Sequence, residues 1–254
     1  MISYNSLTEE DHLFLSKAED CARAAEKYKT PQFTKFISPH ERVVFEQFFE
    51  RSPFVEQMVC GGFNDAERSI IGFFPDFIEP VEALFPISVL RIKAHEELGH
   101  RTVLGSVLGL GIERSLLGDI IPQQDGAILF CVEPIADFIR MNLTRVGRVN
   151  VTVQEAELSS LNIAPKQTKE FSGTVASLRL DAVLGFAIGK SRAKTQDLIS
   201  AGQVQLNWTA CENPSESVAE GDMLSVRGMG RMKVISAGGE TKKGRIRIVI
   251  EQYI

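Results

Sequence analysis

The sequence lacks the features that would place the protein in a membrane or in an oxidising compartment. No apolar run approaches the roughly 20 residues that a membrane span requires. The first residues, MISYNSLTEEDHLF, have neither the basic nor the apolar region of a signal peptide. We therefore expect a cytoplasmic protein with no membrane partner. Disulfides are not expected either, because the cysteines are scattered singly, at Cys21, Cys60, Cys131 and Cys211.

The motifs of catalysis and cofactor binding are also missing. In HEELGH (95–100), His95 and His100 are five residues apart, which separates them by about 140° around a helix instead of placing them on one face for zinc. GLGIERSLLG (109–118) follows a helical pattern and lacks the spacing of a dinucleotide-binding turn. GGETKKGR (238–245) lacks the Walker A spacing and indicates a hairpin turn. We expect no metal, no cofactor and no small-molecule substrate.

Charge is present in quantity but unevenly distributed. The chain has 28 Lys and Arg against 33 Asp and Glu, a formal net charge of −5. Residues 171–254, in contrast, carry 11 basic and 8 acidic side chains. A mildly basic C-terminal module on an acidic body indicates one face that meets a polyanion.

The order of helical and strand patterns predicts an α+β protein of several small domains. Residues 1–80 contain two helical segments and two strand patterns, and the second helix begins with Ser38, Pro39 and Glu41, which suit a capping box. Residues 81–161 follow the order β-α-β-β-α-β, the ferredoxin-like plan that RNA-recognition (RRM) modules share, although no strand carries their stacking aromatics. A polar linker, 162–176, leads to a C-terminal domain over 177–254.

The C-terminal domain begins with two short helices that carry cations at their junction. In LRLDAVLGFAIG, the apolar residues recur with helical spacing and Gly189 ends the helix. Ser191 suits the N-cap of the second helix, and Arg192 and Lys194 fall in its first turn. Cations are disfavoured there by the helix dipole, whereas a phosphate is attracted by both the dipole and the cations. The junction is therefore a candidate phosphate site.

The order of motifs in this domain, R-L-D-x-x-L, S-R-x-K, I-x-x-G-x-V-x-x-N, G-D and V-R-G, resembles the RNA-binding domain named after small-subunit ribosomal protein S-four, the S4 domain. The resemblance covers about residues 177–235. It implies that two helices present a basic face that binds structured RNA. The residues implied to contact phosphates are Arg179, Lys190, Ser191, Arg192 and Lys194, with Arg227 and Arg231 at the border.

Other segments widen the resemblance to nearly the whole chain. GGFNDAER, LGHRTVLGSVLGLGIERSLLGDI and NLTRVGRVNV are similar to bacterial YlmH-type proteins, which have relatives in cyanobacteria and plastids. This resemblance implies a non-catalytic protein that binds ribosomal RNA and tRNA, and that acts in ribosome-associated quality control on large subunits blocked by peptidyl-tRNA. NLTRVGR also places Arg145 and Arg148 in a turn, where we expect a second RNA contact.

The main alternative is an RNA-modifying enzyme that uses the C-terminal domain as an accessory. Pseudouridine synthases have a catalytic Asp in an Arg-Leu-Asp motif, and RLD occurs here at 179–181. That copy lies in the first helix of the S4-type domain, whose own motif contains the same three residues whether or not the protein is an enzyme. The sequence leaves open which RNA element is bound, whether the role is rescue, assembly or photosynthesis-linked, and which oligomer forms.

Arg192 is expected to be the most important single contact. It follows the capping Ser191 directly, so its guanidinium can make a bidentate contact with a phosphate at the helix N-terminus. The sequence shows no folding task for it. We therefore expect Arg192→Ala to weaken RNA binding while stability stays level or rises slightly.

Overall fold

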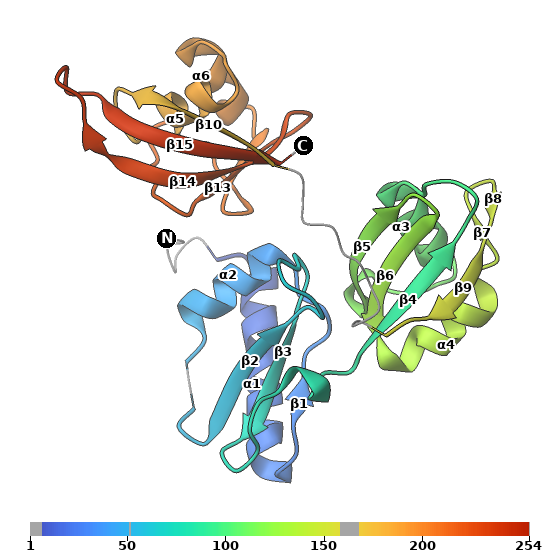
Figure 1. Cartoon of the computed structure of the whole chain (residues 1–254). Helices are drawn as coiled ribbons and strands as arrows, with labels where there is room; N and C mark the ends of the chain where they lie inside the picture. The colour runs from blue at the N-terminus through green and yellow to red at the C-terminus, as the bar shows by residue number, and fades with distance from the viewer. Residues whose placement is uncertain (1–6, 51, 158–167, 254) are drawn as a thin grey trace. The chain divides into compact units, whose positions relative to one another are not determined.

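The computed structural model describes residues 7–50, 52–157 and 168–253. The chain forms two compact units, residues 1–163 and 164–254 (Figure 1). Helices and antiparallel sheets occur in both units, which confirms the predicted α+β class. In the described residues, no helix combines the length and the apolar character needed to cross a membrane.

The first part of unit 1 is a three-stranded antiparallel sheet, in the order β1-β3-β2, with two helices against it. Its second helix starts where the sequence predicts. The Ser38 hydroxyl accepts from the Glu41 N–H at 3.2 Å, and the Glu41 carboxylate accepts from the Ser38 N–H at 2.6 Å, which completes the capping box. The elements are α1 (Glu9–Tyr28), β1 (Gln32–Phe33), α2 (Pro39–Phe48), β2 (Val55–Cys60), β3 (Ile70–Pro75) and the 3-10 helix η2 (Glu82–Leu84).

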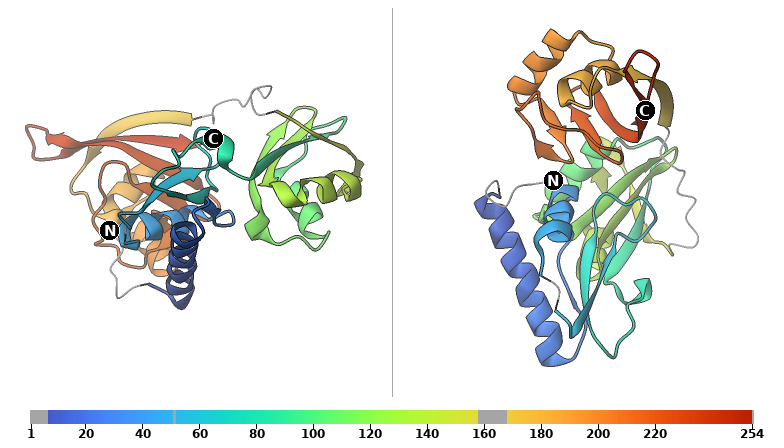
Figure 2. Two further views of the ribbon diagram at one scale, coloured as in Figure 1. Left: turned by 90° about the horizontal axis from the view of Figure 1, so that it is seen from below. Right: turned by 90° about the vertical axis from the view of Figure 1, so that its left-hand side faces the viewer.

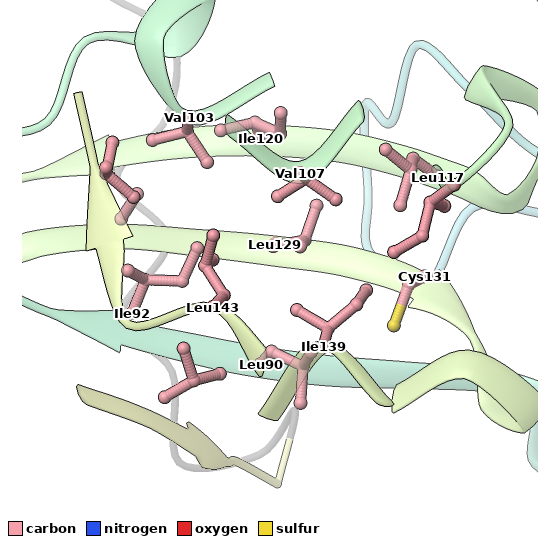
Figure 3. Packing of buried hydrophobic residues seen from close by; sticks show 14 of the residues in the cluster. Leu90, Ile92, Val103, Val107, Leu117, Ile120, Leu129, Cys131, Ile139 and Leu143 are labelled. Carbon is pink, nitrogen blue, oxygen red and sulfur yellow. The ribbon is translucent and has the colours of Figure 1, made fainter. Parts of the chain in front are cut away.

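The second part of unit 1 has the predicted ferredoxin-like plan. Its sheet is antiparallel in the order β5-β6-β4-β9, and α3 and α4 cover one face of it. Figure 3 shows Leu90, Leu129 and Val107 among the side chains of this core. A two-residue hairpin, β7–β8, precedes the last strand. The elements are β4 (Ile87–Lys93), α3 (His100–Leu108), η3 (Arg114–Leu116), β5 (Leu117–Gln123), β6 (Gly126–Val132), α4 (Glu133–Asn142), β7 (Arg145–Val146), β8 (Val149–Asn150) and β9 (Thr152–Glu155).

The other face of this second sheet is buried against the first part of the chain. Side chains alternate along β6, so Leu129 and Cys131 join the helix-covered core while Ile128 and Phe130 face the opposite side. There they pack in one hydrophobic cluster with residues of the first sheet and its loops, including Phe36 and Phe74. RRM modules stack bases on their sheet face, and in this protein that face is occupied by protein. Any RNA contact of this region therefore lies elsewhere on it.

Unit 2 is a six-stranded antiparallel sheet, in the order β10-β15-β14-β13-β11-β12, with two short helices. The predicted linker over 162–176 is wrong in part. Residues 162–167 lie outside the described residues, but 168–175 form the edge strand β10, which pairs with β15 along its whole length. Its mostly exposed polar residues resemble a linker in the sequence because an edge strand needs few buried side chains. The elements are β10 (Thr168–Val175), α5 (Leu180–Ala187), α6 (Arg192–Ser200), β11 (Val204–Leu206), β12 (Thr209–Ala210), β13 (Met223–Val226), β14 (Gly230–Glu240) and β15 (Ile246–Tyr253).

Candidate nucleic-acid interface

Helices α5 and α6 form a corner whose shape follows from local sequence signals. Gly189 ends the first helical segment with φ +63°, a conformation that other residues adopt at a cost. The Lys190 N–H then bonds to the Gly185 carbonyl at 3.0 Å, which closes the turn tightly. Ser191 caps α6 as predicted, since its hydroxyl accepts from the Lys194 N–H at 3.4 Å. The two helix axes therefore meet at a short, defined junction, which we call the basic corner (residues 179–194).

The basic corner is organised around a buried carboxylate. Asp181, in the first turn of α5, has no exposed surface. Its Oδ2 accepts from Arg192 Nε at 2.9 Å and from Gln196 Nε2 at 2.8 Å. The Arg179 guanidinium donates to the same carboxylate at 3.2 and 3.3 Å. One carboxylate thus links the start of α5 to the first turn and a half of α6.

The ionisation of Asp181 follows from these contacts. Burial by itself raises the pKa of Asp181, but the hydrogen bonds from Arg179, Gln196 and Arg192 outweigh it and lower the pKa to about 2. At neutral pH the carboxylate is therefore charged. Its charge fixes the positions of the Arg179 and Arg192 guanidinium groups. The two arginine side chains remain 39% and 57% exposed, respectively.

Both arginines of the corner have a structural contact as well as a charge, which corrects the expectation for Arg192. The sequence showed no folding task for Arg192, but its Nε is bound to the buried Asp181, so the side chain stabilises the helix pair. Arg179 occupies the N-cap position of α5, and its partly exposed side chain donates to the Asp181 carboxylate. We therefore expect Arg192→Ala to lower stability instead of leaving it level. The sequence alone did not reveal the contact, because the partner carboxylate is distant in sequence and its burial is a tertiary property. The sequence contains one signal of this shared contact. Arg192 and Gln196, which both donate to Asp181, lie four residues apart and so on one face of α6.

The two lysines of the corner differ from the arginines. Lys190 and Lys194 are exposed, and within the described part of the chain neither forms an ion pair. Their ammonium groups are therefore available to an external anion. Ser191 lies between them, exposed, with its hydroxyl engaged as the cap of α6. The corner thus combines two pre-positioned guanidinium groups and two unpaired ammonium groups at one helix start.

The structure does not bring Arg227 and Arg231 to this junction. The Arg227 N–H bonds to the Gln203 carbonyl at 3.0 Å, just beyond the far end of α6. A helix of that length separates its ends by about 13 Å. Arg227 is exposed in the turn between β13 and β14, and the half-buried Arg231 is paired in register with Ser225 at the start of β14. Arg227 therefore lies near the far end of α6 and Arg231 in the sheet, and their contact with RNA stays a prediction.

Arg145 and Arg148 are in unit 1, on the β7–β8 hairpin. Both are exposed, and Gly147 between them has φ +59° and bonds through its N–H to the Ser106 hydroxyl at 3.1 Å. That bond holds the hairpin against α3, away from the buried sheet face. Both arginines are thus exposed on a hairpin that is attached to α3.

Comparison with known proteins agrees with this division of the chain. Residues 80–160 match the family described as "Putative RNA-binding domain in YlmH", and residues 178–224 match the S4 domain. The second match contains the basic corner and ends just before Arg227. The first match contains the β7–β8 hairpin.

Two individual proteins are similar over larger parts of the chain. One is "Ribosome-associated protein quality control protein P2" of Bacillus subtilis (strain 168), which is 33% identical over 252 residues, 98% of each chain. The other is a solved structure, "Cell division protein ylmH from Streptococcus pneumoniae", with a TM-score of 0.52 and 26% identity, which covers 62% of this chain and 98% of that one.

Proposed function

This chain belongs to the YlmH-type RNA-binding proteins with a C-terminal S4 domain, and from that premise we propose that it is a ribosome-associated protein that binds RNA without catalysing a reaction. The Bacillus relative, similar from end to end, carries ribosome-associated quality control in its name. We extend that role to this chain. Its partners are then ribosomal RNA and tRNA on the large subunit with peptidyl-tRNA, in the cytoplasm.

The observation that carries the proposal is the charge pattern of the basic corner. Arg179 and Arg192 are held in place by Asp181, and Lys190 and Lys194 beside them have no ion-pair partner in the described part of the chain. Pre-positioned guanidinium groups contact a phosphate with little loss of side-chain freedom. The free N–H groups of the α6 start add a partial positive charge to the same place. The corner therefore suits the phosphate backbone of a structured RNA.

The contacts of Asp181 also bear on the alternative of a pseudouridine synthase. A catalytic Asp must reach its substrate base, whereas Asp181 is fully buried and accepts hydrogen bonds from three side chains. Its role as the structural centre of the corner supports a binding protein. We propose that Asp181→Ala leaves RNA modification unchanged, and that the Arg145 and Arg148 hairpin provides the second RNA contact of the chain.

Co-sedimentation with purified large ribosomal subunits tests the proposal. We expect the full chain to pellet with subunits, and Lys190→Gln combined with Lys194→Gln to reduce the pelleted fraction strongly. If about four phosphates are contacted, the logarithm of affinity should fall with the logarithm of salt concentration with a slope of roughly −3 to −4. Lys17→Gln with Lys27→Gln is a matched control, because both lysines are exposed on α1. Salt-independent pelleting, or equal losses in both double variants, would contradict the proposal.

A further inference from the structure

A second group of cations lies outside the S4 match, at the tip of the β14–β15 hairpin. Residues 238–247 contain four basic side chains and a single carboxylate, Glu240. The hairpin extends past the end of β10 in the views of the C-terminal unit (Figures 1 and 2). The four cations are all exposed: Lys242, Lys243, Arg245 and Arg247. We call these four residues and the turn that carries them the basic tip.

The turn of the basic tip is well defined. The Thr241 N–H bonds to the Arg245 carbonyl at 2.8 Å, and the Gly244 N–H bonds to the Thr241 carbonyl at 2.9 Å. Gly244 has φ +70°, which favours glycine at that position. The lysines at 242 and 243 are the two residues that this turn projects outward. The sequence GGETKKGR thus forms the hairpin turn that its glycines predict.

None of the four cations of the basic tip is engaged by a carboxylate within the described residues. Arg245 donates instead to Thr174 of β10, to the hydroxyl at 2.9 Å and to the carbonyl at 2.6 Å. Those bonds involve neutral acceptors, so they orient the guanidinium without neutralising its charge. Arg247 is paired in register with Thr174 and lies on the same face as Arg245, opposite to the buried Ile248. The tip therefore keeps its full positive charge, and one of its four cations is held in a fixed orientation.

The strand β14 leads to the tip through two irregularities. Its register with β15 shifts between Val234 and Ser236 and again between Ala237 and Glu240. β-Bulges of this kind bend a hairpin and increase its twist, and they often re-aim a functional segment. No folding role explains why such a bent, glycine-containing extension ends in unpaired cations, because like charges at one turn repel each other.

The basic tip is close along the chain to the basic corner. Thr174, which Arg245 contacts, precedes Arg179 by five residues, a span of at most roughly 18 Å even when fully extended. A nucleic acid duplex carries about one charge per 1.7 Å of its axis, so several phosphates fit over that distance. A polyanion held at the corner can therefore reach the tip.

We propose that the basic tip is a second phosphate-binding element, which contacts the same RNA backbone as the basic corner but at a separate position. This inference rests on the proposed function and adds a contact surface to it. RNA is favoured over an acidic protein segment because the described residues 238–247 offer cations and include no exposed large hydrophobic side chain. The contact is to phosphate, so it does not depend on base sequence.

Fluorescence anisotropy of the full chain with an RNA duplex of about 20 base pairs, over a range of salt concentrations, tests the proposal. We expect Lys242→Gln with Lys243→Gln to lower affinity by about tenfold or more at low salt, and to reduce the salt slope by about 2. Thermal stability should be unchanged, because neither side chain has a hydrogen bond or an ion pair within the described residues. The control is again Lys17→Gln with Lys27→Gln, which removes the same charge from α1.

Each other outcome overturns a defined part of the argument. An unchanged affinity in the tip variant, with affinity lost in Lys190→Gln combined with Lys194→Gln, would remove the basic tip and leave the proposed function standing. Equal losses of RNA affinity in the tip and control variants would show that affinity depends only on the net charge of the chain, and would overturn the inference. If poly-glutamate competed as well as RNA for the tip, the partner would be an acidic protein. Absence of any RNA binding by the unmodified chain would instead refute the proposed function.

Discussion

The basic corner and the basic tip use cations in opposite ways, although both are in the C-terminal unit. In the corner, two arginines are tied to a buried carboxylate and so contribute to folding as well as to charge. In the tip, four cations have no carboxylate partner among the described residues, and one of them is oriented by neutral oxygens. A charged group that serves two purposes cannot be changed without affecting both. Mutations of the tip lysines should therefore report on binding alone, whereas mutations of the corner arginines should report on binding and stability together.

The strongest test of this comparison is removal of the carboxylate at the centre of the corner. We expect Asp181→Ala to lower the free energy of unfolding by about 3 kcal/mol, because it breaks a buried charged network that joins α5 to α6. RNA affinity should fall as well, since Arg179 and Arg192 lose their fixed positions. Chemical denaturation with RNA anisotropy measures both. Asp197→Ala, at an exposed position of α6, is the control, and a loss of similar size there would remove Asp181 from its central role.

Substitution of Arg192 should have a smaller effect on stability than Asp181→Ala. The effect should still distinguish the basic corner from the basic tip, where we expect no change in stability. Arg192→Ala deletes one charged hydrogen bond, which we expect to cost about 1 kcal/mol after allowance for the exposure of the side chain. Arg192→Glu should cost about 2 kcal/mol, because it places a second carboxylate next to Asp181. Melting curves alongside subunit pelleting check both values. If either variant melted at the unmodified temperature while the pelleted fraction fell, Arg192 would resemble the cations of the tip.

Acid should weaken the corner and leave the tip unaffected. The pKa of Asp181 is lowered to about 2 in the folded protein, from an ordinary value of 3.8. A group with a lowered folded pKa stabilises the protein above its unfolded pKa, and this stabilisation is lost as pH falls from about 4 towards 2. Because its partners are partly exposed, we expect a contribution of roughly 1 kcal/mol. Asp181→Asn should flatten this part of the stability curve, measured by denaturation at each pH, whereas Lys242→Gln with Lys243→Gln should leave it unchanged.

Much of the fold could be predicted from local signals. The capping box of Ser38 and Glu41, the cap at Ser191 and the glycine-containing turn before β15 each depend on residues a few positions apart. Strand β10 was missed, because its polar sequence resembles a linker and only its pairing with β15 makes it a strand. The predicted RRM-like plan was correct in order, but sequence order says nothing about which face of a sheet another part of the chain covers. Here the covered face is the one that carries Phe130.

For the candidate site, the sequence alone determined which side chains carry charge and where the second helix begins, because residue type and capping are local properties. Only the tertiary structure decided which of those charges are satisfied. Asp181 and Arg192 are eleven residues apart, and whether they meet depends on the angle between α5 and α6. Arg245 and Thr174 are 71 positions apart and are joined only by the pairing of β10 with β15. The interaction between two charges depends on their distance in space and not on their separation in the sequence. An arginine that stabilises the fold and a lysine that is available to a phosphate can therefore be told apart only in the folded chain.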